Sequence, residues 1–451
     1  MKELVAVVKT AKERKKVNFT SEQKSRINQA TLASIIPGGG QFVNKQVLKG
    51  VIFLVIFALY ILHLFSFGFD AFNGLITLGV TPREDHSLFL LIEGVLELLI
   101  TVIFFIFYAV QMWDARNVAK LNAINPDKVN RSAKDILNNL YESGFPYLLT
   151  IPAYILMLFA IVFPVVVTIL IVFTNYDFQH IPPAKLIEWT GFETFNSIFT
   201  LTTYRETFGA VFSWTVIWTL FATTLQVGLG IFLAILMNQP FIKFRRFFGV
   251  ILLLPWAVPA FISILTFSNM FNPSAGAINS QVIPFINNFI PFLEIPALAW
   301  KTDPFWTKVA LISIQGWLGF PYIYVLTTSI LQSIPGEWYE AASIDGASPI
   351  QKFRFITFPH ILSVAAPVLI TQYTGNFNNF TMIYLFNEGG PGSVGNNAGT
   401  TDILISWVYK LTTGQSPQYN VSSAITIIIS TIVIVISLII FKYTNAFEME
   451  D

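Results

Sequence analysis

A run of uncharged polar side chains interrupts an otherwise apolar stretch between residues 371 and 381. Its hydrogen-bonding members are Thr371, Gln372, Tyr373, Thr374, Asn376, Asn378, Asn379 and Thr381. Amides both donate and accept hydrogen bonds, so beside aromatic faces they suit a neutral polyhydroxylated solute, whereas a cationic or phosphorylated solute would call for fixed charges. The same amides can instead tie neighbouring helices together. The residue types leave both interpretations open.

The spacing of these amides predicts a shared surface. On a helix, Asn376 and Asn379 are three residues apart and share a face, and Gln372 lies one turn away on the same side. Gly375 leaves room beside them. An amide without a hydrogen-bond partner in an apolar environment is costly, so we expect this face to line either protein or a water-filled pathway.

Seven stretches of the chain contain no Asp, Glu, Lys or Arg and can each cross the hydrocarbon core of a bilayer, which takes about 20 apolar residues as a helix. They are residues 50–69, 143–176, 207–242, 247–293, 309–336, 355–387 and 411–441. An eighth stretch, 88–110, qualifies despite Glu93 and Glu97. The sequence therefore predicts an all-α, polytopic helical membrane protein with eight transmembrane helices.

Composition excludes several classes of protein. Apolar residues make up 54% of the 451-residue chain and charged residues 12%, where soluble domains have about 25% charged residues. A net charge of +1 gives no basic footprint for nucleic acid, and the absence of Cys rules out disulfides and thiolate chemistry. The four His residues are far apart in the sequence. We expect no nucleic-acid partner, metal, cofactor or catalytic set.

Lysine and arginine predict the orientation, because cytoplasmic loops carry an excess of them. With eight spans and a cytoplasmic N-terminus, 21 of the 27 Lys and Arg residues fall on the cytoplasmic side. We therefore expect a multi-pass protein surrounded by the lipid of the cell membrane, with both termini in the cytoplasm.

The polar, basic segment between the second and third spans is the best candidate for a domain boundary. Residues 1–145 hold a cytoplasmic tail, two peripheral spans and this loop, residues 146–445 hold six spans, and residues 446–451 form a second tail. Six prolines interrupt four of the six later spans, which predicts kinked helices that line a cavity. They are Pro152, Pro164, Pro255, Pro259, Pro321 and Pro367.

The loop after the sixth span predicts a short cytoplasmic helix. Pro335 suits the first turn of a helix, residues 337–344 favour helix, and Gly346 ends it. Ala341 and Ala342 are small, so the backbone of a partner could approach this helix closely.

This loop, residues 333–361, resembles the EAA loop of binding-protein-dependent ABC import permeases, whose form is E-A-A-x3-G-x9-I-x-L-P. The matching residues are Glu340, Ala341, Ala342, Gly346, Ile356 and Pro359, with Phe358 in place of the usual Leu. Stretches at 254–259, 316–322, 376–380 and 387–392 resemble the larger membrane subunit of maltose/maltodextrin importers. The resemblance implies a type I ABC importer permease-like core.

The resemblance also implies a function, partners and sites. It implies a permease subunit that forms the pathway for oligosaccharides, in particular maltose or maltodextrin. Its implied partners are a second homologous permease, two ATP-binding subunits and an extracytoplasmic sugar-binding protein. Implied sugar contacts are Gln315, Leu318, Gly319, Tyr322, Gln372, Gly375, Asn376 and Asn379. Implied ATPase-coupling residues are Glu340, Ala341, Ala342, Asp345 and Gly346. The chain has no Gly-Lys dipeptide and so no phosphate-binding G-x4-G-K-[ST] loop, which places ATP hydrolysis on another chain.

Glu93 and Glu97, four residues apart in the second span, keep one alternative open. An acidic residue within a membrane is by default a functional candidate, so this pair could serve a secondary, proton-coupled solute carrier. Both lie in the outer half of the span, and no Lys or Arg within the membrane is available to pair with them. A packing or interfacial role is therefore the favoured interpretation.

Overall fold

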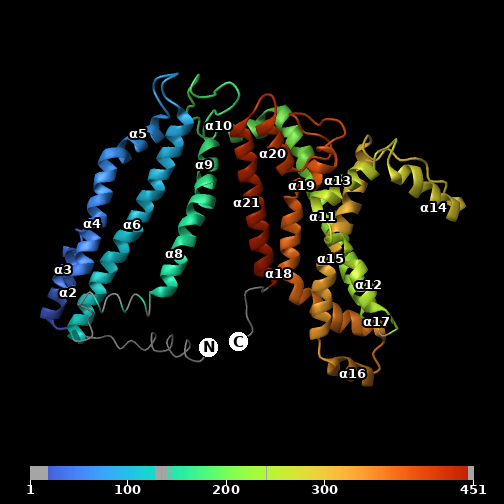
Figure 1. Cartoon of the computed structure of the whole chain (residues 1–451), viewed down its shortest axis with the longest axis horizontal. Coiled ribbons are helices and arrows are strands. Elements are labelled where there is room, and N and C mark those ends of the chain that lie inside the picture. The colour runs from blue at the N-terminus through green and yellow to red at the C-terminus, as the bar shows by residue number, and fades with distance from the viewer. Residues whose placement is uncertain are drawn as a thin grey trace. The chain divides into compact units, whose positions relative to one another are not determined.

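The computed structural model describes residues 19–126, 144–239 and 241–444, together with residues 134, 138 and 141. Residues 1–18, most of the basic loop between 127 and 143, and the expected tail at 446–451 lie outside the described residues. Where the chain is described, its regular structure is helical apart from two isolated bridges (Figure 1). The predicted all-α class is confirmed.

Seven helices of the described chain are long and apolar enough to cross a membrane, and one bent helix pair brings the number to eight. They are Val47–Thr77, Ser87–Ile124, Phe145–Ile171, Thr202–Met237, Pro304–Ser333, Pro349–Asn387 and Tyr419–Ile440, with the bent pair Arg245–Trp256 and Ala260–Met270. Each overlaps one of the eight predicted stretches, and the bent pair corresponds to the predicted fifth span.

Two compact units make up the chain. Unit 1 comprises residues up to Leu170 and His180–Glu188, and unit 2 comprises Ile171–Gln179 and the residues from Trp189 onward. The helices of unit 1 are α2 (Ser21–Ala33), α3 (Gly39–Val43), α4 (Val47–His63), α5 (Phe69–Thr77), α6 (Ser87–Ile124), α8 (Phe145–Met157) and most of α9 (Phe163–Ile171). π-helical turns join α4 to α5 and α8 to α9 into continuous spans.

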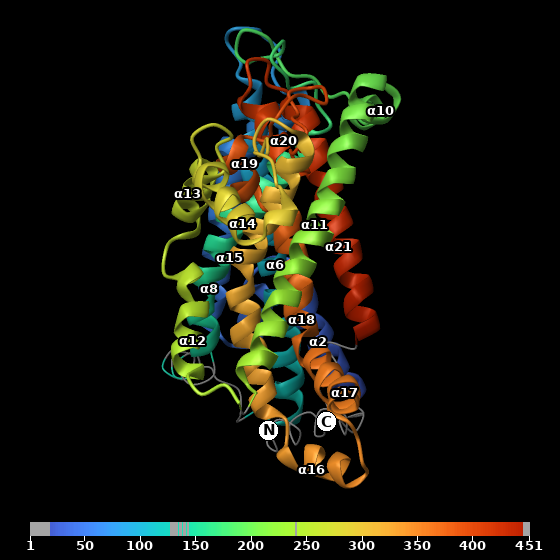
Figure 2. The ribbon, with the colours of Figure 1, turned by 90° about the vertical axis from the view of Figure 1, so that its right-hand side faces the viewer.

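Unit 2 carries the remaining helices. They are α10 (Glu193–Thr200), α11 (Thr202–Met237), α12 (Arg245–Leu252), α13 (Ala260–Met270), α14 (Ile283–Phe289), α15 (Pro304–Ser333), α16 (Gly336–Ile344), α17 (Pro349–Lys352), α18 (Phe358–Phe377), α19 (Phe380–Asn387), α20 (Leu404–Thr413) and α21 (Tyr419–Thr444). Within this unit, α16 lies at one end, and α10, α13, α19 and α20 lie at the other (Figures 1 and 2).

The core of unit 2 forms where α11 packs against α15 and α18. A Cβ at Gly230 of α11 would lie 2.5 Å from the Cβ of Ile323 on α15, so glycine is needed for this close approach. Trp218 of α11 is fully buried, and its indole N–H donates to the backbone oxygen of Asn376 on α18 at 2.9 Å. These contacts place α11 between its two neighbours.

The predicted fifth span, 247–293, is shorter and bent in the structure. Its first part ends at Trp256, its second part begins at Ala260, and the two meet at 84°. Pro255 and Pro259 lie at this break, because proline supplies no N–H to the helical ladder. The prolines inside α15 and α18 leave those helices continuous.

Candidate functional site

Five side-chain amides from four helices meet inside unit 2, and we call them the amide cluster. They are Gln226 of α11, Gln315 of α15, Gln372 and Asn376 of α18, and Asn379 at the start of α19. Hydrogen bonds between 3.0 and 3.4 Å link each member to at least one other. Four of the five are residues that the sequence singled out.

Gln226 is the hub of the amide cluster and is only 1% exposed. Its Nε2 donates to Oε1 of Gln372 at 3.0 Å. Its Oε1 accepts from Nε2 of Gln315 at 3.1 Å and from Nδ2 of Asn376 at 3.3 Å. A Cβ at Gly319 of α15 would collide with Gln226 Oε1, so glycine leaves the Gln226 amide room to hold this position.

Asn376 is 4% exposed and joins α18 to α11. Besides its bond to Gln226, its Nδ2 donates to Oγ1 of Thr223 at 2.9 Å. Its Oδ1 accepts from Nδ2 of Asn379 at 3.4 Å. The amide is therefore satisfied by protein groups, which is the helix-tying role that the residue types left open.

Asn379 begins a new helix, so the continuous helix predicted through residues 371–381 is wrong. Its Oδ1 accepts from the N–H of Met382 at 3.2 Å and caps α19, a role for which asparagine is strongly preferred. Its Nδ2 donates to Oε1 of Gln315 at 3.1 Å. Asn379 and Asn376 thus reach the same cluster from different helices.

The other predicted sugar contacts lie next to these amides along α15 and α18. Leu318 is half-buried against the apolar core, and Gly319 faces Gln226. Tyr322 is 38% exposed. Gly375 is exposed, and a Cβ there would meet no atom within 4 Å. Tyr322 and Gly375 therefore face away from the packed interior.

Sequence reasoning missed Gln226 and Thr223. The signal was present, because Gln226 is the only side-chain amide of α11 (Thr202–Met237). An amide without a partner in an apolar span is as costly at Gln226 as it is at residues 371–381. With Gln226 included, the cluster offers several neutral donors and acceptors and no charged group, which is the chemistry that hydroxyl groups match.

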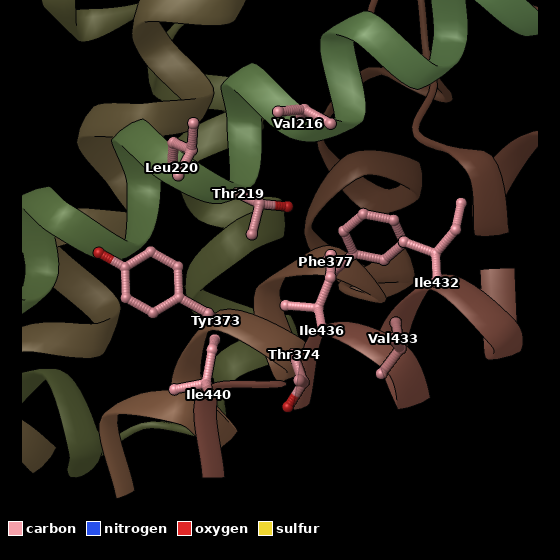
Figure 3. Close-up of a pocket in the computed structure, with 10 residues that line it drawn as sticks. All are labelled: Val216, Thr219, Leu220, Tyr373, Thr374, Phe377, Ile432, Val433, Ile436 and Ile440. Carbon is pink, nitrogen blue, oxygen red and sulfur yellow. The ribbon is translucent and has the colours of Figure 1, made fainter. Parts of the chain in front are cut away.

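An apolar groove of about 340 Å³ runs between α11, α18 and α21 (Figure 3). The hydroxyls of Thr219 and Thr374 are among its lining, but each donates to a backbone oxygen of its own helix. The groove therefore presents mainly hydrocarbon, and we do not consider it a site for a polyhydroxylated solute.

α16 is the helix predicted for the loop after the sixth span. It runs Gly336–Ile344 with Pro335 as its N-cap, and Gly346 follows with φ of 76°. A side chain other than glycine is strained at that φ, so glycine is needed where the chain turns away. The hydroxyls of Tyr339 and Thr357, 2.8 Å apart, tie α16 back to the start of the following span.

The loop that carries α16 and α17 exposes apolar as well as charged side chains. Ile344 is 86% exposed, and Ile350 and Phe355 are also exposed. Glu340 and Asp345 are exposed beside them. Single exposed apolar residues are ordinary, but three close in sequence on one loop are typical of a docking surface.

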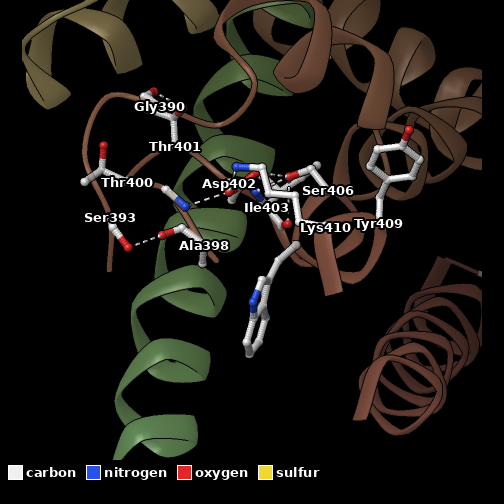
Figure 4. A network of polar contacts seen from close by, with 12 residues as sticks. Gly390, Ser393, Ala398, Thr400, Thr401, Asp402, Ile403, Ser406, Tyr409 and Lys410 are labelled. Atoms are coloured by element: carbon white, nitrogen blue, oxygen red, sulfur yellow. Dashed lines mark hydrogen bonds and ion pairs between the residues drawn. The ribbon is translucent and has the colours of Figure 1, made fainter. Parts of the chain in front are cut away.

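At the opposite end of unit 2, a buried ion pair organises the loop before α20 (Figure 4). Asp402 is fully buried; it accepts from Lys410, from the Ser406 hydroxyl and from the N–H of Gly399. Burial raises the pKa of the Asp402 carboxyl above its ordinary value, and the Lys410 ammonium opposes that rise. A Cβ at Gly389 would collide with this carboxylate, so the loop folds tightly around the pair.

Glu93 and Glu97 have different surroundings in unit 1. Glu93 is exposed, whereas Glu97 is buried with its Oε2 2.7 Å from Nε2 of His63 on α4. Sequence reasoning missed His63 as a partner because it considered only Lys and Arg. The pair joins α6 to α4, which favours the packing role over a proton-coupled carrier.

Comparisons with known proteins identify relatives over nearly the whole length. Residues 226–447 match the family described as binding-protein-dependent transport system inner membrane component. The chain is 61% identical to the maltodextrin transport system permease protein MdxF of Bacillus subtilis (strain 168), over 94% of this chain and 97% of the relative. It is 59% identical to the maltodextrin transport system permease protein MalC of Streptococcus pneumoniae serotype 4, over 97% of this chain and 100% of the relative.

Two further comparisons extend the picture. The galactooligosaccharides transport system permease protein GanP of Bacillus subtilis (strain 168) is 48% identical, over 93% of this chain and 98% of the relative. Among solved structures, a chain of a bacterial ABC transporter involved in the import of the acidic polysaccharide alginate has a TM-score of 0.56 at 20% identity. It covers 70% of this chain and 99% of that chain, and the likeness concerns the fold alone.

Proposed function

Because the chain belongs to the family of binding-protein-dependent transport system inner membrane components, and is therefore a multi-span permease of an ABC importer, we propose that its solute is an oligosaccharide, most simply a maltodextrin. Two maltodextrin permeases are 61% and 59% identical to the chain, whereas a galacto-oligosaccharide permease is 48% identical. Relatedness therefore favours maltodextrin.

The amide cluster is the observation that carries this proposal. Its five members are neutral, lie between the helices of the unit that contains the family match, and both donate and accept. A sugar hydroxyl also both donates and accepts hydrogen bonds. An amide of the cluster can therefore exchange its bond to a neighbouring amide for a bond to the sugar at little net cost. In the structure the amides satisfy each other, and solute entry would exchange these bonds for bonds to hydroxyls.

Tyr322 and Gly375 supply the surface beside the amides. An exposed aromatic face suits the apolar face of a sugar ring, and the space next to Gly375 admits a ligand close to the backbone. We assign solute contact to these two residues, with Gln315, Leu318, Gly319, Gln372, Asn376 and Asn379.

ATP hydrolysis is assigned to a separate subunit that docks on α16. The exposed Ile344 can enter an apolar pocket of that partner, while Glu340 and Asp345 can meet its cations. Ala341 and Ala342 let the partner approach closely. A complete importer would then combine this chain, a second homologous permease, two ATP-binding subunits and an extracytoplasmic sugar-binding protein.

The orientation follows from the same assignment. With α16 on the cytoplasmic side, both termini are cytoplasmic and the Asp402 loop faces outward, toward the sugar-binding protein. Residues 146–445 would act as the six-helix permease core, with residues 1–145 as a peripheral pair of spans.

Reconstitution tests the function. The complex is purified through this chain and placed in proteoliposomes with ATP inside or outside, and uptake of labelled maltotriose is measured with its binding protein present. We expect uptake that requires ATP on the α16 side, survives a proton ionophore and is competed by maltodextrins more strongly than by galacto-oligosaccharides. Uptake abolished by the ionophore but independent of ATP would support the carrier based on Glu93 and Glu97 instead.

A further inference from the structure

A polar cavity, distinct from the amide cluster, opens at the end of unit 2 that carries α16. It has a volume of about 530 Å³, within the range of about 300–1,000 Å³ that small-molecule sites occupy. It lies between the end of α11, the start of α12 and the last turns of α15, and its polar lining consists of Asn238, Arg245, Arg246, Tyr324, Thr328 and Gln332.

The cavity is cationic. Arg245 and Arg246 open α12, and residues 238–247 contain no acidic residue. Within the part of the chain that the structure describes, neither guanidinium forms an ion pair. Two adjacent guanidinium groups without a carboxylate are arranged for an anion, and planar guanidinium forks match the oxygens of a phosphate especially well.

The inner wall adds neutral donors and keeps space open. The hydroxyls of Tyr324 and Thr328 and the amide of Gln332 come from α15. A Cβ at Gly249 would lie 3.3 Å from the Tyr324 hydroxyl, so glycine on α12 leaves this hydroxyl accessible from the cavity. The site therefore combines two cations with hydroxyl and amide donors around one space.

The surroundings of the arginines are apolar. Phe241, Phe244 and Phe247 flank them in sequence and are all strongly exposed. Exposed phenylalanine rings at the end of a membrane span offer apolar surface that the hydrocarbon of a lipid can cover. An anionic group that carries acyl chains therefore suits this site better than a free anion from water.

We propose that this cavity binds the phosphate of an anionic phospholipid, with Arg245 and Arg246 on its oxygens and the phenylalanines against its acyl chains. The site lies in the leaflet next to α16, since Gln332 precedes the start of α16 by only four residues. The assignment does not depend on which sugar is transported or on how the termini are oriented.

Lipid retention tests the site on the whole complex. The complex is exchanged into nanodiscs of equal parts phosphatidylglycerol and phosphatidylcholine, released, and its retained lipids are counted by native mass spectrometry. We expect phosphatidylglycerol to be retained about tenfold over phosphatidylcholine, and Arg245→Gln/Arg246→Gln to remove that preference. Lys243→Gln, which removes a nearby charge outside the cavity, is the matched control and should keep it.

Several results would overturn the proposal. Equal retention of the two lipids by the native complex, or equal loss in the Lys243→Gln control, would leave only general attraction to anionic lipid. If excess inorganic phosphate displaces phosphatidylglycerol and raises the melting temperature of the complex as much as the lipid does, the site would be assigned to free phosphate. If the double glutamine variant fails to assemble, Arg245→Lys/Arg246→Lys keeps the charges but removes the forks; unchanged retention in that variant would contradict the proposed geometry.

Discussion

Nδ2 of Asn376 donates a hydrogen bond to Oε1 of Gln226 at 3.3 Å, and this bond joins α18 to α11 where both side chains are almost completely buried. The same two residues therefore hold helices together and present the chemistry that a sugar would use. The two interpretations of the polar residues are not exclusive, because an amide cluster that is satisfied when closed can exchange partners when a solute enters.

Gln226 should be the most sensitive position for assembly. Gln226→Leu removes three hydrogen bonds and leaves buried amides on α15 and α18 without this partner, at a cost of about 1–3 kcal/mol for each that finds no other. We expect a lower yield of folded complex and a lower melting temperature by size-exclusion fluorescence. Gln281→Leu, an exposed glutamine of the same unit, is the control. Equal stability of the two variants would contradict the hub role.

Two glycines separate packing from solute contact. Gly319→Ala places a Cβ against Gln226 Oε1, so this amide must move away from Gln315 and Asn376 or α15 must shift, and assembly should fall in either case. Gly375→Ala meets no atom of the chain, and alanine favours helix over glycine by about 1 kcal/mol, so stability should be kept or raised. If Gly375 faces the solute, this second variant should still transport more slowly per assembled complex. Melting temperature and uptake, measured together, distinguish the two effects.

If an ATPase subunit docks on α16, this helix should tolerate change only where that partner does not approach. Gly346→Leu costs about 1–2 kcal/mol locally because of the positive φ and blocks close approach; Glu340→Lys reverses an exposed charge. We expect both variants to insert normally but to lose ATPase subunits during purification. Gly336→Ala, at an open position without a positive φ, is the control. Normal ATPase co-purification in the first two variants would contradict the docking role.

The loop before α20 should become sensitive to pH when the ion pair between Asp402 and Lys410 is broken. Lys410→Met removes the cation that opposes the rise in the pKa of Asp402, so that pKa should rise further above 3.8. A carboxyl with a raised pKa in the folded state stabilises that state at low pH, and this stabilisation is lost as the pH rises through that pKa. The loop of the variant should therefore open on going from acid to neutral pH. Breaking a buried pair costs about 3–5 kcal/mol.

Limited proteolysis across pH measures this opening. Adding Asp402→Asn to Lys410→Met removes the titrating group, and the pH dependence of cleavage should then disappear. Cleavage that rises toward acid pH in the single variant would contradict the sign of the effect.

Orientation is testable because the native chain has no cysteine. Ser343 lies on α16 and Ser416 follows α20, and both are exposed. A cysteine at Ser416 should react with an impermeant thiol reagent in intact cells, and one at Ser343 only after permeabilisation. Labelling of both in intact cells would contradict the assigned topology.

Patterns along the chain predicted the elements better than their junctions. Charge-free stretches locate the spans because hydrocarbon excludes charge, and the sequence around Gly346 locates α16 because its turn needs a positive φ. The prolines predicted a kink at Pro255 and Pro259, whereas the structure has an interruption between two separate helices. Two prolines four residues apart remove neighbouring helical hydrogen bonds. Such a break depends on the fold around it, which local sequence does not specify.

The amide cluster shows the same division. The polar residues between 371 and 381 were evident from the sequence. The cap formed by Asn379 and the hydrogen bond between Asn376 and Gln226 could be found only in the three-dimensional structure. Gln226 and Gln315 are 89 residues apart in sequence, so no spacing rule along one helix connects them.

The most direct test of the account is sugar uptake per assembled complex for Asn379→Leu beside Asn378→Leu. Asn379 donates to Gln315 and Asn376, whereas the side chain of the adjacent Asn378 is exposed and donates to the backbone oxygen of Thr374 in its own helix. Asn379→Leu should leave a sugar hydroxyl without its amide partner, at a cost of about 1–3 kcal/mol, and lower sugar affinity by about 5- to 150-fold. Uptake is divided by the amount of assembled complex, so that lower expression does not affect the comparison. Asn378→Leu should transport at the native rate. Native uptake per assembled Asn379→Leu complex would contradict the assignment of the amide cluster to the solute pathway.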